Sequence, residues 1–167
     1  MRINKEQRVG VFVDVQNLYY SAKNLYKAKV NFAQVLREAV RGRKLVRAIA
    51  YAIKANIKEE KAFHDALESI GYEVKTKDLQ TFAGGAKKGD WDIGIAMDMI
   101  ELANKLDTLI LVSGDGDFVD LLQHLKRAMG CKIEVMAFGP SSSGKLREEA
   151  DEFFDIDKYK SKFLIKY

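Results

Sequence analysis

A short apolar run that ends in an acidic, glycine-containing turn constrains the fold of this chain more than any other feature. The run, Thr108–Val112, has the β-branched and leucine residues expected of a strand that is buried on both faces. Residues 113–117 form the turn, and from Phe118 onward leucines recur at helical spacing. The chain therefore passes from a buried strand to a helix across a turn that carries two carboxylates, Asp115 and Asp117.

Strand-like and helix-like segments alternate along the rest of the chain, which is typical of a parallel sheet with helices on both faces. The expected strands are Val9–Val15, Leu45–Ile53, Tyr72–Thr76, Thr108–Val112 and Lys132–Phe138, with a short sixth strand at Phe153–Ile156. The longer expected helices are the one that Asn31 caps and that runs to Val40, Lys58–Ile70, Asp90–Leu106, the segment from Phe118 to Gly130, and Lys145–Ala150. We expect an α/β fold with three layers, α/β/α, and a mainly parallel sheet of five or six strands in a Rossmann-like order 3-2-1-4-5.

Length and composition indicate one domain, residues 1–167, with a basic tail at 158–167. No apolar run approaches the roughly 18 residues of a membrane span, and the N-terminus lacks the apolar segment of a signal peptide. Cys131 is the only cysteine, so we expect a cytoplasmic protein without disulfides, and two histidines are too few for a structural zinc site. The net charge is +4, but residues 1–47 hold eleven Lys/Arg against three Asp/Glu, which allows a polyanionic partner.

Acidic residues follow two strands that should be neighbours. Asp14 closes the first expected strand, and Asp115 and Asp117 follow the fourth. In the order 3-2-1-4-5 these strands meet at the point where the crossover direction reverses, where α/β sheets place their ligands. Carboxylates that lie so near to one another raise each other's pKa unless a cation neutralises them. Mg²⁺ or Mn²⁺ is the usual cation. The alternative for Asp117 is a simple helix N-cap.

The helix expected at Asp90–Leu106 offers a further acid, and the choice is between Asp92 and Asp98. Six residues of helix place these two side chains about 120° apart and about 9 Å apart along the axis, so one ion should not use both. Asp92 lies nearer the N-terminus of the helix and is the better candidate. Asp92 could instead be only a favourable charge near the helix dipole, and Asp90 could replace it.

The chain resembles the NYN domain family, the LabA-like branch of the PIN-like ribonuclease fold, over roughly residues 9–157. The residues that carry the resemblance are Val11–Asp14 with Asn17, Lys88-Gly89 with Trp91-Asp92, and Ser113–Phe118. The resemblance implies that Asp14, Asp92, Asp115 and Asp117 form an acidic metal cluster, which Asn17 and Ser113 support. One departure is that two residues separate Gly89 from Asp92, where the family more commonly has one.

The resemblance further implies metal-dependent hydrolysis of RNA phosphodiester bonds, in which a divalent ion activates water and offsets charge on the phosphate. We expect an endonuclease acting on single-stranded or structured RNA, although the residues leave endo- and exonucleolytic cleavage, the number of ions and a homodimeric state open. The residues expected to contact RNA are basic or aromatic: Tyr19, Tyr20, Lys23, Lys27, Lys87 and Lys88.

Three other functions compete with this one. The chain could be a non-catalytic RNA-binding or regulatory module that retains the fold. A haloacid-type phosphatase would need Asp-x-Asp after the first strand, where this chain has Asp14-Val15-Gln16. A nicotinamide-binding protein would need Gly-x-Gly-x-x-Gly there, which is absent.

Overall fold

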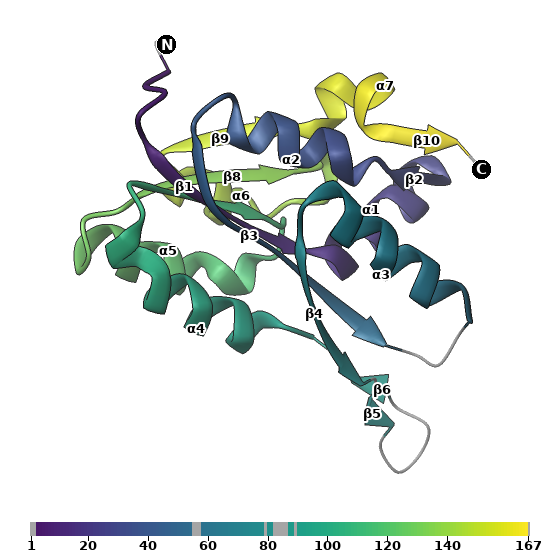
Figure 1. The fold of residues 1–167 in the computed structure, drawn as a ribbon. Coiled ribbons are helices and arrows are strands. Elements are labelled where there is room, and N and C mark those ends of the chain that lie inside the picture. The colour runs from purple at the N-terminus through teal and green to yellow at the C-terminus, as the bar shows by residue number, and fades with distance from the viewer. Residues whose placement is uncertain (1–2, 55–57, 79, 82–86, 89, 167) are drawn as a thin grey trace.

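A parallel sheet between two layers of helices forms the centre of the computed structural model, which describes residues 3–54, 58–78, 80–81, 87–88 and 90–166 (Figure 1). In this part of the chain the main sheet has six strands in the order β4-β3-β1-β7-β8-β9, and all neighbouring pairs are parallel. Their bounds are β1 Arg8–Asp14, β3 Lys44–Lys54, β4 Glu73–Asp78, β7 Thr108–Val112, β8 Lys132–Ala137 and β9 Glu152–Asp155. The three-layer class is confirmed, and β9 extends the five strands of the predicted order by a sixth at the edge.

Alternate residues of the central strands face opposite helical layers, because successive side chains of a strand point to opposite faces. In β1, Val9, Val11 and Val13 belong to one buried cluster, and Phe12 belongs to the other. β7 divides in the same way, and all five of its residues are buried. The continuous apolar run therefore reflects burial on both faces.

Two groups of helices supply the outer layers. One face is covered by α1 (Val15–Tyr26), α2 (Phe32–Val40) and α3 (Lys58–Ile70), and the other by α4 (Asp92–Leu102), α5 (Val119–Arg127) and α6 (Gly144–Glu149), as Figure 1 shows. The short 3₁₀ turns are Ala103–Lys105, Gly116–Phe118, Gly139–Ser141 and Ile156–Tyr159. No helix in the described ranges is long and apolar enough to cross a membrane.

The helix boundaries follow local hydrogen bonds. The Asn31 side chain accepts a hydrogen bond from the backbone N–H of Gln34 and caps α2 as predicted. The predicted helix Asp90–Leu106 is too long at both ends. It begins at Asp92, whose N–H donates to the Asp90 carboxylate, and its last residues tighten into the 3₁₀ turn Ala103–Lys105.

The basic C-terminal segment also joins the fold. After β9 the chain forms α7 (Lys160–Phe163) and β10 (Leu164–Lys166), and β10 pairs antiparallel with β2 (Ala28–Val30). The Phe163 side chain is buried in the same cluster as α1 and α2. A second small antiparallel pair consists of β5 (Gln80–Thr81) and β6 (Lys87–Lys88), and residues 82–86 between them fall outside the described residues.

Candidate metal centre

Asp14 is the acid that the fold holds most firmly. It is the last residue of β1, and its side chain is 8% exposed. Its Oδ1 accepts a hydrogen bond from the backbone N–H of Asn17 at 3.3 Å, so Asp14 also caps α1. Its Oδ2 accepts one from the Ser113 hydroxyl at 3.1 Å. Because each carboxylate oxygen has two lone pairs, both oxygens can still bind a cation.

The turn after β7 lies next to Asp14 because β7 pairs with β1. The buried Ser113 hydroxyl donates to Asp14 and accepts from the backbone N–H of Asp115 at 3.2 Å. The Asn17 side chain accepts from the backbone N–H of Gly114 at 3.0 Å, which ties the turn to the start of α1. These hydrogen bonds of Asn17 and Ser113 hold Asp14 and the turn at Asp115 in a fixed relative position.

The two glycines of the turn allow another segment to approach closely. A Cβ atom on Gly114 would lie 3.0 Å from Ser142, and one on Gly116 would lie 2.9 Å from the Ser143 hydroxyl. The backbone N–H of Ser143 donates to the Gly114 carbonyl at 2.9 Å. Glycine at these positions thus lets the segment before α6 form one wall of the site.

Asp92 reaches the site from the first turn of α4, and Trp91 fixes that turn. The Trp91 indole donates to the Ala52 carbonyl at 2.9 Å, and its ring centroid lies 5.3 Å from that of Tyr51. A Cβ atom on Gly94 would lie 2.5 Å from the Trp91 ring, so the ring rests directly on the α4 backbone.

Three carboxylates converge in this way. Asp14, Asp92 and Asp115 offer oxygen atoms that all lie within 4.8 Å of one another. Burial raises the pKa of Asp14 to about 6, although its hydrogen bonds from Asn17 and Ser113 act in the opposite direction. Burial, followed by the charge of Asp115, raises the pKa of Asp92 to about 7. The metal-free site therefore resists full ionisation at neutral pH, and a bound cation would relieve this repulsion.

Asp117 and Asp98 lie outside this group of three. Asp117 is exposed, and its backbone N–H donates to the Asp115 carboxylate at 2.9 Å, so Asp115 is the residue that caps the following 3₁₀ turn. The Asp98 carboxylate accepts hydrogen bonds from the Tyr51 hydroxyl and the Lys75 ammonium, each at 2.7 Å. Of the two aspartates on α4, the structure brings Asp92 to the site and pairs Asp98 elsewhere.

The sequence did not single out the basic residues of β4 that neighbour the start of α4. The Lys77 ammonium donates to the Asp90 carbonyl at 2.9 Å and lies 4.5 Å from the Trp91 ring centroid. Lys75 pairs with Asp98. The sequence did contain a signal for them: Lys75 and Lys77 are two residues apart on one strand, and residues at that spacing point to the same face of a sheet.

The residues predicted to contact RNA divide into two groups. Tyr19, Tyr20, Lys23 and Lys27 are exposed and lie on α1 or at its end, on the helix that begins beside Asp14. The two tyrosine rings are 5.3 Å apart in an edge arrangement, and the Lys23 ammonium lies 5.9 Å from the Tyr19 centroid. Lys87 and Lys88 form β6, and their side chains fall outside the described part of the structure.

The sequence profile of the NYN domain matches residues 8–157, which include every element that contributes to this site. The chain belongs to the NYN domain family. This is a PIN-like nuclease family, and three of the four acids that the family resemblance implied, Asp14, Asp92 and Asp115, lie close together in the structure.

Two relatives of this NYN domain match nearly the whole chain. The Low amplitude and bright protein LabA of Synechococcus elongatus is 29% identical over 168 residues, covering 94% of this chain and 88% of LabA. The crystal structure of a protein of unknown function from Vibrio parahaemolyticus is 36% identical and superposes with a TM-score of 0.89, covering 99% of this chain and 100% of that chain.

The acid cluster of the NYN domain fits a hard divalent cation. Mg²⁺ and Ca²⁺ bind oxygen ligands at about 2.0–2.6 Å, so two ligands on opposite sides of one ion lie about 4–5 Å apart. The limit of 4.8 Å between the carboxylate oxygens agrees with this spacing. Asp14, Asp92 and Asp115 are the residues that would hold the ion, and their oxygen donors suit magnesium or manganese.

Proposed function

We propose that this NYN domain is a metal-dependent ribonuclease that hydrolyses RNA phosphodiester bonds at Asp14, Asp92 and Asp115. The observation that carries the proposal is the convergence of these three carboxylates within 4.8 Å at the carboxyl ends of β1 and β7. Two of the acids are partly or wholly buried with raised pKa values, a combination that marks functional sites more often than structural ones.

Hydrogen bonds from neighbouring residues hold the acids of the candidate site in a fixed geometry. The hydrogen bonds from Ser113 and Asn17 fix the plane of the Asp14 carboxylate, and Trp91 fixes the turn that presents Asp92. A bound Mg²⁺ or Mn²⁺ would supply Lewis-acid activation of water and of the phosphate. Preorganised ligands of this kind avoid reorganisation during the reaction.

The exposed residues of α1 are the proposed RNA contacts nearest to the acids. Tyr19 and Tyr20 present aromatic surfaces on which unstacked bases can rest, and Lys23 and Lys27 provide charge for phosphates. Stacking of this kind needs unpaired bases, so single-stranded or looped RNA is the proposed substrate. We extend the proposal to Lys87 and Lys88 on the grounds of their sequence alone.

The test is cleavage of a mixed RNA panel with Mg²⁺, with Mn²⁺ and with EDTA, using wild type beside Asp14→Asn and Asp115→Asn. We expect cleavage that needs a divalent ion and that both variants lose. Asp65→Asn removes an exposed carboxylate of α3 away from the cluster and serves as the charge-matched control. Equal cleavage by wild type and both site variants would refute the proposal, since it would trace the activity to a contaminant.

A second candidate function is a non-catalytic module that binds RNA or a regulatory partner. One observation favours it: Asp117 is not among the converged acids, so only three of the four predicted metal ligands meet. Salt-sensitive RNA binding by wild type in the presence of Mn²⁺, with no cleavage of any RNA in the panel, would support this function instead.

A further inference from the structure

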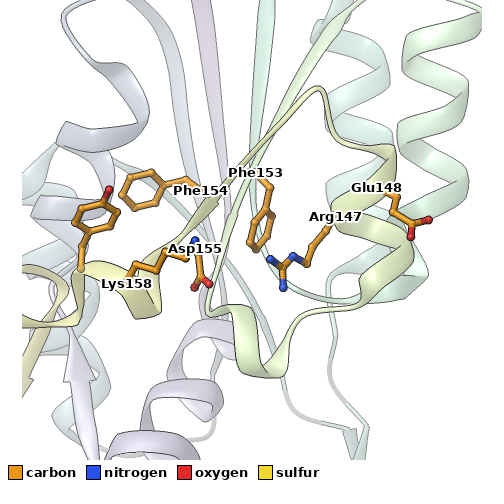
Figure 2. A pocket seen from close by; sticks show the side chains of 7 residues that line it. Arg147, Glu148, Phe153, Phe154, Asp155 and Lys158 are labelled. Carbon is orange, nitrogen blue, oxygen red and sulfur yellow. The ribbon is translucent and has the colours of Figure 1, made fainter. Parts of the chain in front are cut away.

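A cavity of about 460 Å³ lies at the edge of the sheet, beside β9 and away from the acid cluster. Figure 2 shows Phe153 with Arg147 on one side of the strand and Phe154 on the other, with Asp155 and Lys158 between them. The two phenylalanines separate because neighbouring residues of a strand point to opposite faces. The cavity therefore combines aromatic rings from both faces of the sheet at one open edge.

The lining of this cavity carries two cations, Arg147 and Lys158, and two carboxylates, Glu148 and Asp155. The Arg147 guanidinium lies 4.5 Å from the Phe153 ring centroid, and among the described residues neither Arg147 nor Lys158 has a carboxylate within ion-pair distance. Asp155 is already engaged, because its Oδ1 accepts hydrogen bonds from the backbone N–H groups of Gly139 at 2.8 Å and Asp157 at 3.0 Å.

The other carboxylate of the lining, Glu148, lies apart from the rings. In Figure 2 its carboxylate points away from the rings. The two cations beside the rings are thus available to an anionic group such as a phosphate.

Tyr159 offers an aromatic face beside these cations. Its ring stacks on Phe154 with centroids 5.1 Å apart and an angle of 17°, and the residue is 47% exposed. Stacking on Phe154 holds the Tyr159 ring in place and leaves its outer face open. A preformed ring with an open face is the platform on which a nucleobase stacks.

The segment 139–143 connects a lining residue of the cavity to the turn of the candidate metal centre. The segment 139–143 is held at one end by Asp155, through Gly139, and at the other end Ser143 contacts Gly114 of the metal-site turn. Both sites lie at the carboxyl ends of parallel strands, and β9 is two strands from β7. That separation is about 10 Å, or about three nucleotides of a stacked single strand.

We propose that this cavity is a nucleotide-binding subsite for the RNA strand, in which Arg147 and Lys158 hold a phosphate and Tyr159 stacks a base about three nucleotides from the scissile bond. The inference rests on the proposed ribonuclease function for the scissile position. Its own evidence is the pairing of open cations with a fixed aromatic ring beside the edge strand β9, at the same end of the parallel strands as the acids.

The experiment measures fluorescence anisotropy of labelled RNA in EDTA, which prevents cleavage. The variants are the double change Arg147→Gln with Lys158→Gln, and Tyr159→Leu. The matched control is Lys105→Gln with Arg127→Gln, which removes two exposed cations from the 3₁₀ turn at 103–105 and from the end of α5. Thermal melts establish that each variant is folded.

We expect the cavity double variant to reduce the slope of log affinity against log salt by about 0.7 for each phosphate that the missing cations neutralised, while the control leaves the slope unchanged. Tyr159→Leu should weaken binding about tenfold, because one base can no longer stack on the ring. The measurements are repeated with a series of RNAs in which one strand is lengthened by one nucleotide at a time from either end. Both effects should appear only with the RNAs that are long enough to reach the cavity.

The outcomes separate the two proposals. If wild type binds long RNA and the cavity variants bind it with the same affinity and salt slope, the subsite is wrong while the ribonuclease proposal stands. If wild type cleaves RNA only with metal but the cavity variants lose affinity for short and long RNA equally, the cavity does not bind a nucleotide remote from the scissile bond. The proposed subsite is then wrong as well. If wild type neither binds nor cleaves RNA, both proposals fall.

Discussion

Replacing Asp14 by asparagine should stabilise the metal-free protein at neutral and higher pH. Asparagine can still accept the hydrogen bond from the Asn17 N–H and can donate its amide to the Ser113 hydroxyl, so the cap and the link to β7 are kept. What the change removes is a charge on a side chain that is 8% exposed and close to Asp92 and Asp115.

The magnitude follows from the pKa of Asp14. The pKa is 3.8 for the unperturbed group and about 6 in the folded protein. Since the folded pKa is the higher one, the folded state binds the proton more tightly, and wild type loses stability as pH rises from about 4 to about 7. At about 1.4 kcal/mol for each pKa unit, the full loss is about 3 kcal/mol. The Asp14→Asn variant cannot ionise and avoids this loss.

The assay is urea unfolding of both proteins in EDTA across that pH range. The variant should gain stability over wild type as pH rises, approaching about 3 kcal/mol above pH 7, and the difference should shrink to its baseline near pH 4. A difference that is constant with pH, or that grows as pH falls, would falsify the reasoning. With Mn²⁺ added the order should reverse, because a ligand bound only to folded wild type raises its melting temperature.

Four further predictions concern the site and the core. Asp92→Asn should abolish metal-dependent RNA cleavage without lowering the melting temperature of the metal-free protein, whereas Asp98→Asn should keep most activity; exchanged roles would move the site to Asp98. Because the pKa of Asp92 is about 7, protons compete with the cation, and Mn²⁺ affinity measured by calorimetry should rise between about pH 6 and pH 8; a flat profile contradicts this. Gly94→Ala should cost about 1–3 kcal/mol in urea unfolding and weaken Mn²⁺ binding, since its Cβ would lie 2.5 Å from the Trp91 ring; unchanged values in both assays would contradict the role of Trp91. Phe163→Ala should cost about 3–5 kcal/mol, and an unchanged unfolding midpoint would mean that the C-terminal segment is not part of the core.

The sheet could be predicted because its signals are local. A strand buried on both faces needs a continuous apolar run, and Thr108–Val112 has one, so its place at the centre of the sheet follows from its composition. Helix ends were predicted less well, since they depend on single hydrogen bonds. The start of α4 at Asp92 depends on the orientation of the Asp90 carboxylate, which no periodicity reports.

For the site, the sequence alone determined which acids stand at strand ends. Asp14 and Asp115 each follow a buried strand, and strand order places them together, because parallel strands that pair bring their carboxyl ends to one edge. Predicting that Asp14 and Asp115 lie together required no knowledge of the directions of their side chains.

Only the tertiary structure decided which further acid joins them. Asp117 is two residues from Asp115 but is directed elsewhere, whereas Asp92 comes from a different layer and meets Asp14 because Trp91 anchors the first turn of α4. The cavity beside β9 could not be predicted either: its lining residues lie within 147–159, but they belong to three consecutive elements, and how these pack against one another is not visible in their spacing. Sequence spacing describes how far apart residues are along one element, but the distance between side chains of different elements depends on how those elements are rotated and packed, and this is fixed only when the core forms.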